Sequence, residues 1–160
     1  MLNVNIICIG KLKEKYWTEA VREYSKRLSA FCKFSVIELS EYRIADNPSE
    51  KQKQTVISEE GKAILSKLKT GDFTIGMCIE GKIISSEELS ELIEAAPING
   101  KSTVNFLIGG SYGLSDEVKN RCDRRISMGR MTFPHQLARV MLCEQIYRAF
   151  QISTGGKYHK

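Results

Sequence analysis

Alternation between strand-like and helix-like segments is the feature that most constrains the fold of this chain of 160 residues. Short β-rich runs stand at residues 2–9, 34–39, 73–79, 103–108 and 125–127. Helical spacing or helix-capping residues follow each run, over 13–31, 49–68, 85–96, from 115 onward and over 135–152. This order predicts a layered α/β domain with a mostly parallel sheet of five to six strands flanked by helices.

The helical segments carry local signals of their own. Ser49 with Gln52 and Ser85 with Glu88 each form a capping box, which satisfies backbone N–H groups at a helix start. The second of these helices is expected to stop before Pro97. The last helix is apolar on more than one face, so it either lies inside the core or faces another subunit, and we favour the subunit interface.

Composition indicates one soluble globular domain over residues 1–160. The chain is 42% hydrophobic and 27% charged, and no apolar run approaches the ~20 residues of a membrane span. The first strand lacks the basic flank of a signal peptide. Five widely spaced cysteines without a CxxC pair indicate reduced thiols in a cytoplasmic protein, and two histidines argue against a metal site.

Charge is distributed unevenly along the chain. Residues 1–33 hold seven Lys and Arg against three acids, residues 34–100 hold seven against twelve, and residues 101–160 hold ten against four. If the two basic ends lie together in space, they form a positive face that attracts phosphates. Scattered solvated lysines explain the same count equally well.

Glycine-bearing segments follow three of the expected strands, at 80–82, 109–113 and 128–134. Ligands of open α/β sheets bind at the carboxyl ends of strands, so these segments mark a candidate small-molecule site. The first strand is followed by Gly10-Lys11-Leu12-Lys13 rather than GxGxxG, and no P-loop occurs, so neither a dinucleotide site nor an NTPase site is supported.

Several sequence words, in order along the chain, resemble the RlmH family of the SPOUT superfamily. They are IGKLK at 9–13, FLIGGSYG at 106–113, MTFPHQ at 131–136, EQIYRAF at 144–150 and YHK at 158–160. Members of that family methylate N3 of a pseudouridine in bacterial 23S ribosomal RNA. The resemblance covers essentially the whole chain.

The resemblance implies a C-terminal trefoil knot, over about residues 72–160, that binds S-adenosylmethionine in a bent form. It also implies a homodimer without a metal ion. The family's cofactor contacts fall here on Met77, Gly109, Met128, Gly129, Arg130, Met131, Thr132 and Phe133. Met77, Met131 and Phe133 can supply apolar walls for an adenine ring, and the glycines can supply backbone groups to pair with it.

Methyl transfer from a sulfonium needs mainly alignment of donor and acceptor, together with a basic surround that favours loss of the acceptor proton. Candidates for the basic groups are His135, Arg139, Tyr158 and His159. The resemblance implies that the last two reach the active site of the partner subunit. An alternative role for His135 is a residue that only begins the last helix.

The leading interpretation is therefore an S-adenosylmethionine-dependent methyltransferase that acts on 23S ribosomal RNA in assembled ribosomes. A non-catalytic, ribosome-associated RNA-binding module with the same fold is the alternative. An α/β enzyme acting on a small metabolite is a third class, and the basic chain ends argue against it.

Overall fold

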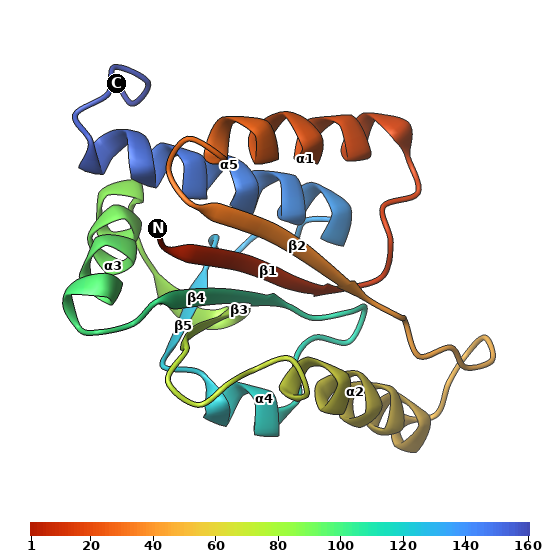
Figure 1. Cartoon of the computed structure of the whole chain (residues 1–160). Helices are drawn as coiled ribbons and strands as arrows, with labels where there is room; N and C mark the ends of the chain where they lie inside the picture. The colour runs from red at the N-terminus through yellow and green to blue at the C-terminus, as the bar shows by residue number, and fades with distance from the viewer.

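Five strands and five helices alternate along the chain without exception (Figure 1), in a computed structural model that describes residues 1–160. The strands are β1 (Asn3–Ile9), β2 (Lys33–Leu39), β3 (Phe73–Ile83), β4 (Thr103–Ile108) and β5 (Arg124–Ser127). The helices are α1 (Lys15–Leu28), α2 (Glu50–Leu65), α3 (Ser86–Ile98), α4 (Asp116–Arg121) and α5 (His135–Ser153). The predicted element order is confirmed.

The strands form one sheet in the order β2-β1-β4-β3-β5, and every neighbouring pair is parallel. Parallel neighbours need a crossover, and each crossover here carries a helix. The predicted α/β class is confirmed with five strands. Because all five strands run the same way, their carboxyl ends lie along one edge of the sheet, where ligands of such folds bind.

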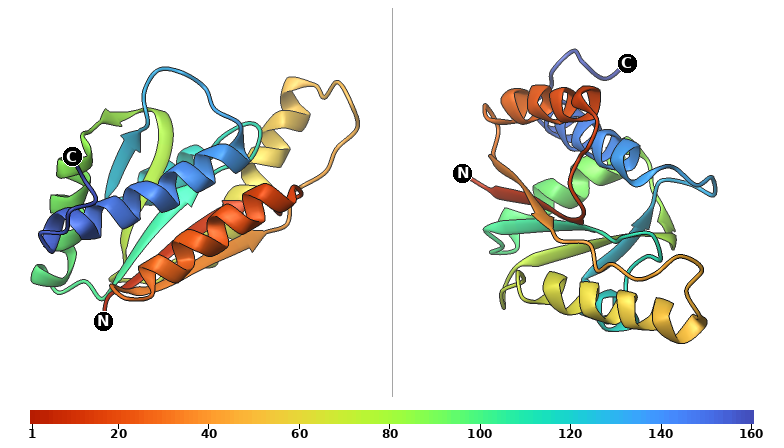
Figure 2. Two further views of the ribbon diagram at one scale, coloured as in Figure 1. Left: turned by 90° about the horizontal axis from the view of Figure 1, so that it is seen from above. Right: turned by 90° about the vertical axis from the view of Figure 1, so that its right-hand side faces the viewer.

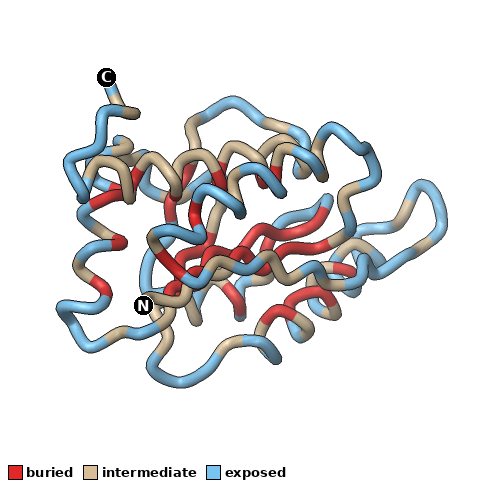
Figure 3. The backbone as a smooth tube through the Cα atoms, turned by 45° about the horizontal axis from the view of Figure 1, so that its top comes forward, coloured by how far each residue is buried: buried red, intermediate tan, exposed pale blue.

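Helices cover both faces of the sheet (Figures 1 and 2). On one face α5 packs between α1 and α3, and on the other face α2 packs against α4. Successive side chains of β1 point to opposite faces, so Val4, Ile6 and Cys8 join the larger core while Ile7 and Ile9 join the smaller one. Figure 3 shows the burial concentrated in the central strands and the inner faces of the helices.

Both predicted capping boxes are present. Ser49 Oγ accepts from the Gln52 backbone N–H at 3.2 Å, and Ser85 Oγ accepts from that of Glu88 at 3.1 Å. The helix behind Ser85 does not stop before Pro97, however, because α3 includes that residue. A proline so close to a helix end removes only one N–H from the last turn, which ends two residues later at Asn99.

The third strand also extends beyond its predicted end at residue 79. It continues to Ile83 because β5 pairs with it on both sides of a bulge, so that Ile126 is the register partner of both Met77 and Lys82. Gly81 is therefore part of a strand and not a turn. A Cβ on Gly81 would lie 2.6 Å from the Ile126 carbonyl carbon, so only glycine permits this close approach of two backbones.

Candidate cofactor cavity and active site

A cavity of about 450 Å³ lies at the carboxyl ends of β4 and β5, beside the bulge in β3. Three segments supply most of its wall: residues 77–80, residues 108–114 and the segment from 127 to 135. The second and third segments are the glycine-bearing segments that the sequence places after strands, whereas the predicted segment 80–82 lies within β3 and contributes only Glu80 to the wall. The parallel topology has brought together residues that are up to about 60 positions apart.

Seven of the eight predicted cofactor contacts line this single cavity. They are Met77, Gly109, Met128, Gly129, Met131, Thr132 and Phe133. Arg130 lies in the same loop but is exposed and does not contribute to the wall. Met131 is 75% exposed at the cavity, which excludes core packing as the reason for that methionine.

Gly109 and Gly113 allow the segment after β4 to fold back tightly on itself. A Cβ on Gly109 would lie 2.6 Å from the Gly113 carbonyl carbon, and Gly113 has φ +84°. The Gly113 N–H donates to the Gly110 carbonyl at 3.0 Å and closes the turn. We predicted that glycine here makes room for a ligand, and the structure shows that it first makes room for the turn itself.

The same turn presents backbone donors. The N–H groups of Ser111 and Tyr112 make no hydrogen bond within the chain, and both residues line the cavity. Both residues are exposed, so these two N–H groups are accessible to a ligand. An unpaired run beside an apolar wall is therefore a suitable place for ligand acceptor atoms.

A second turn, after β5, forms the opposite wall of the cavity. Ser127 Oγ accepts from the Gly129 N–H at 3.1 Å and donates to the Gly129 carbonyl at 2.9 Å. Gly129 has φ +127°, a conformation that a side chain would strain. The buried Ser127 hydroxyl thus holds the direction in which residues 130–133 leave the strand.

An ion pair and a thiol occupy the polar side of the cavity. Lys119 of α4 pairs with Glu80 of β3, and the Lys119 hydrogen bond lowers the pKa of the Glu80 carboxyl. Sequence reasoning missed Lys119, because nothing in its local pattern distinguishes it from other surface lysines. Burial, followed by the Glu80 charge, raises the pKa of the nearby Cys78 thiol, which argues against a thiolate nucleophile.

Comparison with known proteins agrees with this geometry. A family profile described as "Predicted SPOUT methyltransferase" matches residues 2–159. The chain belongs to the SPOUT methyltransferase family. The prediction of a methyltransferase enzyme is thereby confirmed.

Relatives match this SPOUT methyltransferase along its full length. Proteins named "Ribosomal RNA large subunit methyltransferase H" are 48% identical over 160 residues in Oenococcus oeni and 50% identical over 159 residues in Clostridium novyi. Each match covers at least 99% of this chain and 100% of the relative. A probable methylase family protein from Haemophilus influenzae has a similar fold, with a TM-score of 0.55 at 14% identity over 99% of this chain and 71% of that one.

The four predicted basic residues of this SPOUT methyltransferase lie in three different places. His135 is exposed at the cavity, as the first residue of α5. The helix start there has no side-chain cap, because Pro134 occupies the N-cap position. Arg139, one turn later, is only 1% exposed and makes its polar contacts with Glu38, Ile9 and Gly10, so the structure does not bring it to the cavity.

Tyr158 and His159 belong to the C-terminal tail, which follows the end of α5 remote from His135 (Figure 1). The tail lies back along the helix, because its contacts include Glu144 in the middle of α5. Tyr158 donates to Glu144 Oε1 at 3.2 Å, and His159 lies 2.6 Å from Glu87 and 3.0 Å from Arg148 through its two ring nitrogens. Burial, followed by the hydrogen bond to Tyr24, raises the pKa of Tyr158 to about 12. Within one chain, neither residue joins the cavity of the predicted cofactor contacts.

A second cavity, of about 500 Å³, shares a wall with the first. Met77, Ser127 and Met128 line both, and Glu144 and Gln145 of α5 line the second alone. Ser86 at the start of α3 donates to Gln145 Oε1 at 2.7 Å. Sequence reasoning did not predict this cavity, which exists because α3 and α5 meet over the end of β3.

No group of three or more His, Cys, Asp or Glu side chains is placed to hold a metal ion. None of the helices is both long enough and apolar enough to cross a bilayer.

Proposed function

We propose that this protein is an S-adenosylmethionine-dependent methyltransferase that methylates N3 of a pseudouridine in 23S ribosomal RNA. Membership of the SPOUT family supports methyl transfer, and the names of the full-length relatives support ribosomal RNA of the large subunit as the substrate. The observation that carries the proposal is the single cavity in which seven predicted cofactor contacts meet. Assembled ribosomes are the proposed substrate, and the free thiols fit a cytoplasmic location.

The cavity suits the cofactor in size and chemistry. Its volume of about 450 Å³ falls within the ~300–1,000 Å³ typical of small-molecule sites. Met77, Met131 and Phe133 provide apolar contact for an adenine ring, and the free N–H groups of Ser111 and Tyr112 can donate to it. Lys119 and Glu80 offer one charge of each sign for an amino-acid moiety. When bound, the cofactor supplies a methyl group activated by a positively charged sulfur.

The protein's own task is to align the acceptor base and to remove its N3 proton. His135 is the one predicted basic residue that already lies at the cavity, so a ring nitrogen of His135 is the proposed proton acceptor within the chain. The uncapped start of α5 adds the positive end of a helix dipole beside it, which favours the anionic base over the neutral one.

We also propose a homodimer in which the tail of one subunit completes the active site of the other. Tyr158 and His159 do not line the first cavity of their own chain, so another copy must supply them to that cavity if they take part in the reaction. The α5 residues Val140 and Met141 are only half-buried and line the second cavity, which leaves apolar surface for a partner. The trefoil knot over residues 72–160 belongs to the same proposal.

Transfer of tritiated methyl groups from S-adenosylmethionine tests the proposed function directly. Large subunits, whole ribosomes and free 23S RNA from cells that lack this protein are the three acceptors, and mass mapping locates the methyl group. We expect one methyl group on N3 of a pseudouridine, and faster transfer to ribosomes than to free RNA. Binding of ribosomes without binding of the cofactor would instead favour the non-catalytic alternative.

A further inference from the structure

Arg139 is the largest fully buried side chain of the protein, and two separate elements hold its charge. Nη1 donates to Glu38 Oε2 of β2 at 2.9 Å. Nη2 donates to the carbonyl oxygens of Ile9 at 3.3 Å and Gly10 at 3.0 Å, where β1 ends. A buried charge is costly unless it is paired and hydrogen-bonded, so this arrangement must serve a structural relationship that the fold keeps.

The segment held in this way is the connection between β1 and α1. Gly10 turns out of the strand with φ +87°, and its N–H donates to the Leu39 carbonyl at 2.7 Å. The Leu12 N–H then donates to the same Glu38 carboxylate at 3.1 Å. Arg139 is therefore connected to this loop in two ways, directly through the Gly10 carbonyl and indirectly through Glu38.

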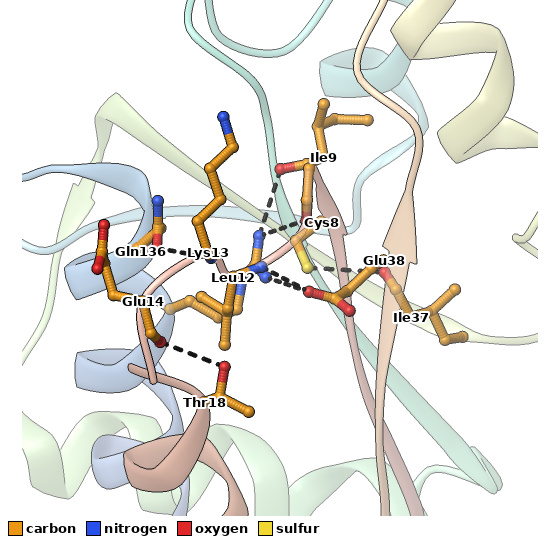
Figure 4. Close-up of polar contacts among 11 residues, drawn as sticks. Cys8, Ile9, Leu12, Lys13, Glu14, Thr18, Ile37, Glu38 and Gln136 are labelled. Carbon is orange, nitrogen blue, oxygen red and sulfur yellow. Dashed lines mark hydrogen bonds and ion pairs between the residues drawn. The ribbon is translucent and has the colours of Figure 1, made fainter. Parts of the chain in front are cut away.

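The loop is also tied to the start of α5. The Lys13 N–H donates to Gln136 Oε1 at 3.3 Å, and the neighbour of Gln136 is His135 at the cavity. Lys13 is exposed, and Figure 4 shows its side chain extending away from the Arg139 cluster. One face of α5, which carries Gln136 and Arg139, thus sets the position of the loop that bears Lys13. This places Lys13 close to the start of α5, where His135 lies at the cavity.

We propose that Arg139 is a positioning residue for RNA binding: it holds the β1–α1 loop against α5 so that Lys13 contacts a phosphate next to the acceptor nucleotide. This inference rests on the proposed function and adds to it the part of the chain that places the RNA. It replaces the prediction of Arg139 as a catalytic group, because a fully buried guanidinium with these partners does not touch the reacting atoms.

The guanidinium fork is essential to this role. Arg139 reaches the carboxylate and two carbonyl oxygens through two nitrogens, whereas a lysine ammonium is a single point that cannot span them. Arg139→Lys therefore keeps the buried positive charge but releases part of the loop. Gln136→Ala, which removes an acceptor from a half-buried position, releases the same loop from the other side with little risk to folding.

The test is the salt dependence of binding to large ribosomal subunits, measured for single and double variants. Each lost phosphate contact lowers the slope of log affinity against log salt by about one. We expect Lys13→Gln and Arg139→Lys each to lower the slope by about one, and the double variant to lower it by about one rather than two. Gln136→Ala should lower it by a fraction of one.

Lys67→Gln is the matched control, because Lys67 is exposed just after α2 on the opposite face of the sheet. Any effect of Lys67→Gln on the slope of log affinity against log salt should add to that of Arg139→Lys. Calorimetry should show unchanged S-adenosylmethionine binding in Arg139→Lys and Gln136→Ala. A wild-type slope in Arg139→Lys, or additive losses with Lys13→Gln, would overturn the inference alone. Wild-type protein that does not bind subunits would overturn the proposed function as well.

Discussion

The Glu60 carboxylate lies directly against Gly110, so that a Cβ on this glycine would stand 2.5 Å from Glu60 Oε1. Glu60 is 3% exposed on α2, and its other oxygen accepts from the Tyr42 N–H at 3.1 Å. Oε1 itself has no hydrogen-bond partner. A buried acid from a distant helix thus packs against the turn that lines the proposed cofactor cavity.

This contact predicts an ordered set of stabilities. Gly110→Ala should lower the free energy of unfolding by about 1 kcal/mol, because the clash is with the end of a side chain that can shift. Gly109→Ala should cost more, because its Cβ would meet backbone atoms of Gly113 at 2.6 Å. Adding Glu60→Ala should restore unfolding free energy to Gly110→Ala but not to Gly109→Ala. Urea unfolding measures the free energy of unfolding of the two glycine variants, each with and without Glu60→Ala. An equal gain from Glu60→Ala in both would contradict the contact between Glu60 and Gly110.

Glu60 also predicts a pH dependence of stability. Burial raises its pKa above the ordinary 4.5, more than the Tyr42 hydrogen bond lowers it. The folded state then holds this proton more tightly than the unfolded state, so unfolding free energy falls as pH rises from about 4.5 through the raised folded-state pKa. Glu60→Gln should remove this loss and be stabilised relative to wild type at pH 7.5 more than at pH 4.5. Melting curves at pH 7.5 and pH 4.5 measure the stability of both proteins. An equal difference between Glu60→Gln and wild type at the two pH values would exclude a contribution from Glu60 ionisation.

Thr132 offers the cleanest test of the cofactor cavity. It is exposed on the wall, so Thr132→Trp should fill space in the cavity without disturbing the core. We expect calorimetry to show a loss of S-adenosylmethionine binding of at least tenfold, about 1.4 kcal/mol, with the melting temperature unchanged. Thr55→Trp, at an exposed position of α2, is the control. Wild-type affinity in a folded Thr132→Trp protein would move the cofactor site elsewhere.

The tail prediction is tested by mixing two inactive proteins. A variant without residues 157–160 keeps its cavity, and the Thr132→Trp variant keeps its tail. If tails act across a homodimer, random mixing should restore about a quarter of wild-type methyl transfer, because half the dimers are mixed and each has one complete site. Light scattering should report about twice 18.1 kDa. Full activity of the truncated protein alone would remove the tail from the mechanism.

The sequence by itself determined the ten elements and the fold class. Capping boxes, apolar periodicity and glycine punctuation act over a few residues, so they can be recognised without knowing the fold. The glycine-bearing segments already contained six of the seven predicted contacts that line the cavity, and the resemblance to a known family added Met77 and the identity of the ligand. Two of the errors of extent, at residue 79 and at Pro97, arose where pairing with β5 and the position of the proline within the last turn outweighed local signals.

Only the tertiary structure decided the roles of Glu60, Lys119 and Arg139. Each contacts partners at least 18 positions away along the chain: Glu60 at Tyr42, Lys119 at Glu80 and Arg139 at Glu38. A charged residue on a helix has the same local pattern whether it faces solvent or a buried partner. Its burial depends on which strand the crossovers place beside it, and long-range packing alone decides that.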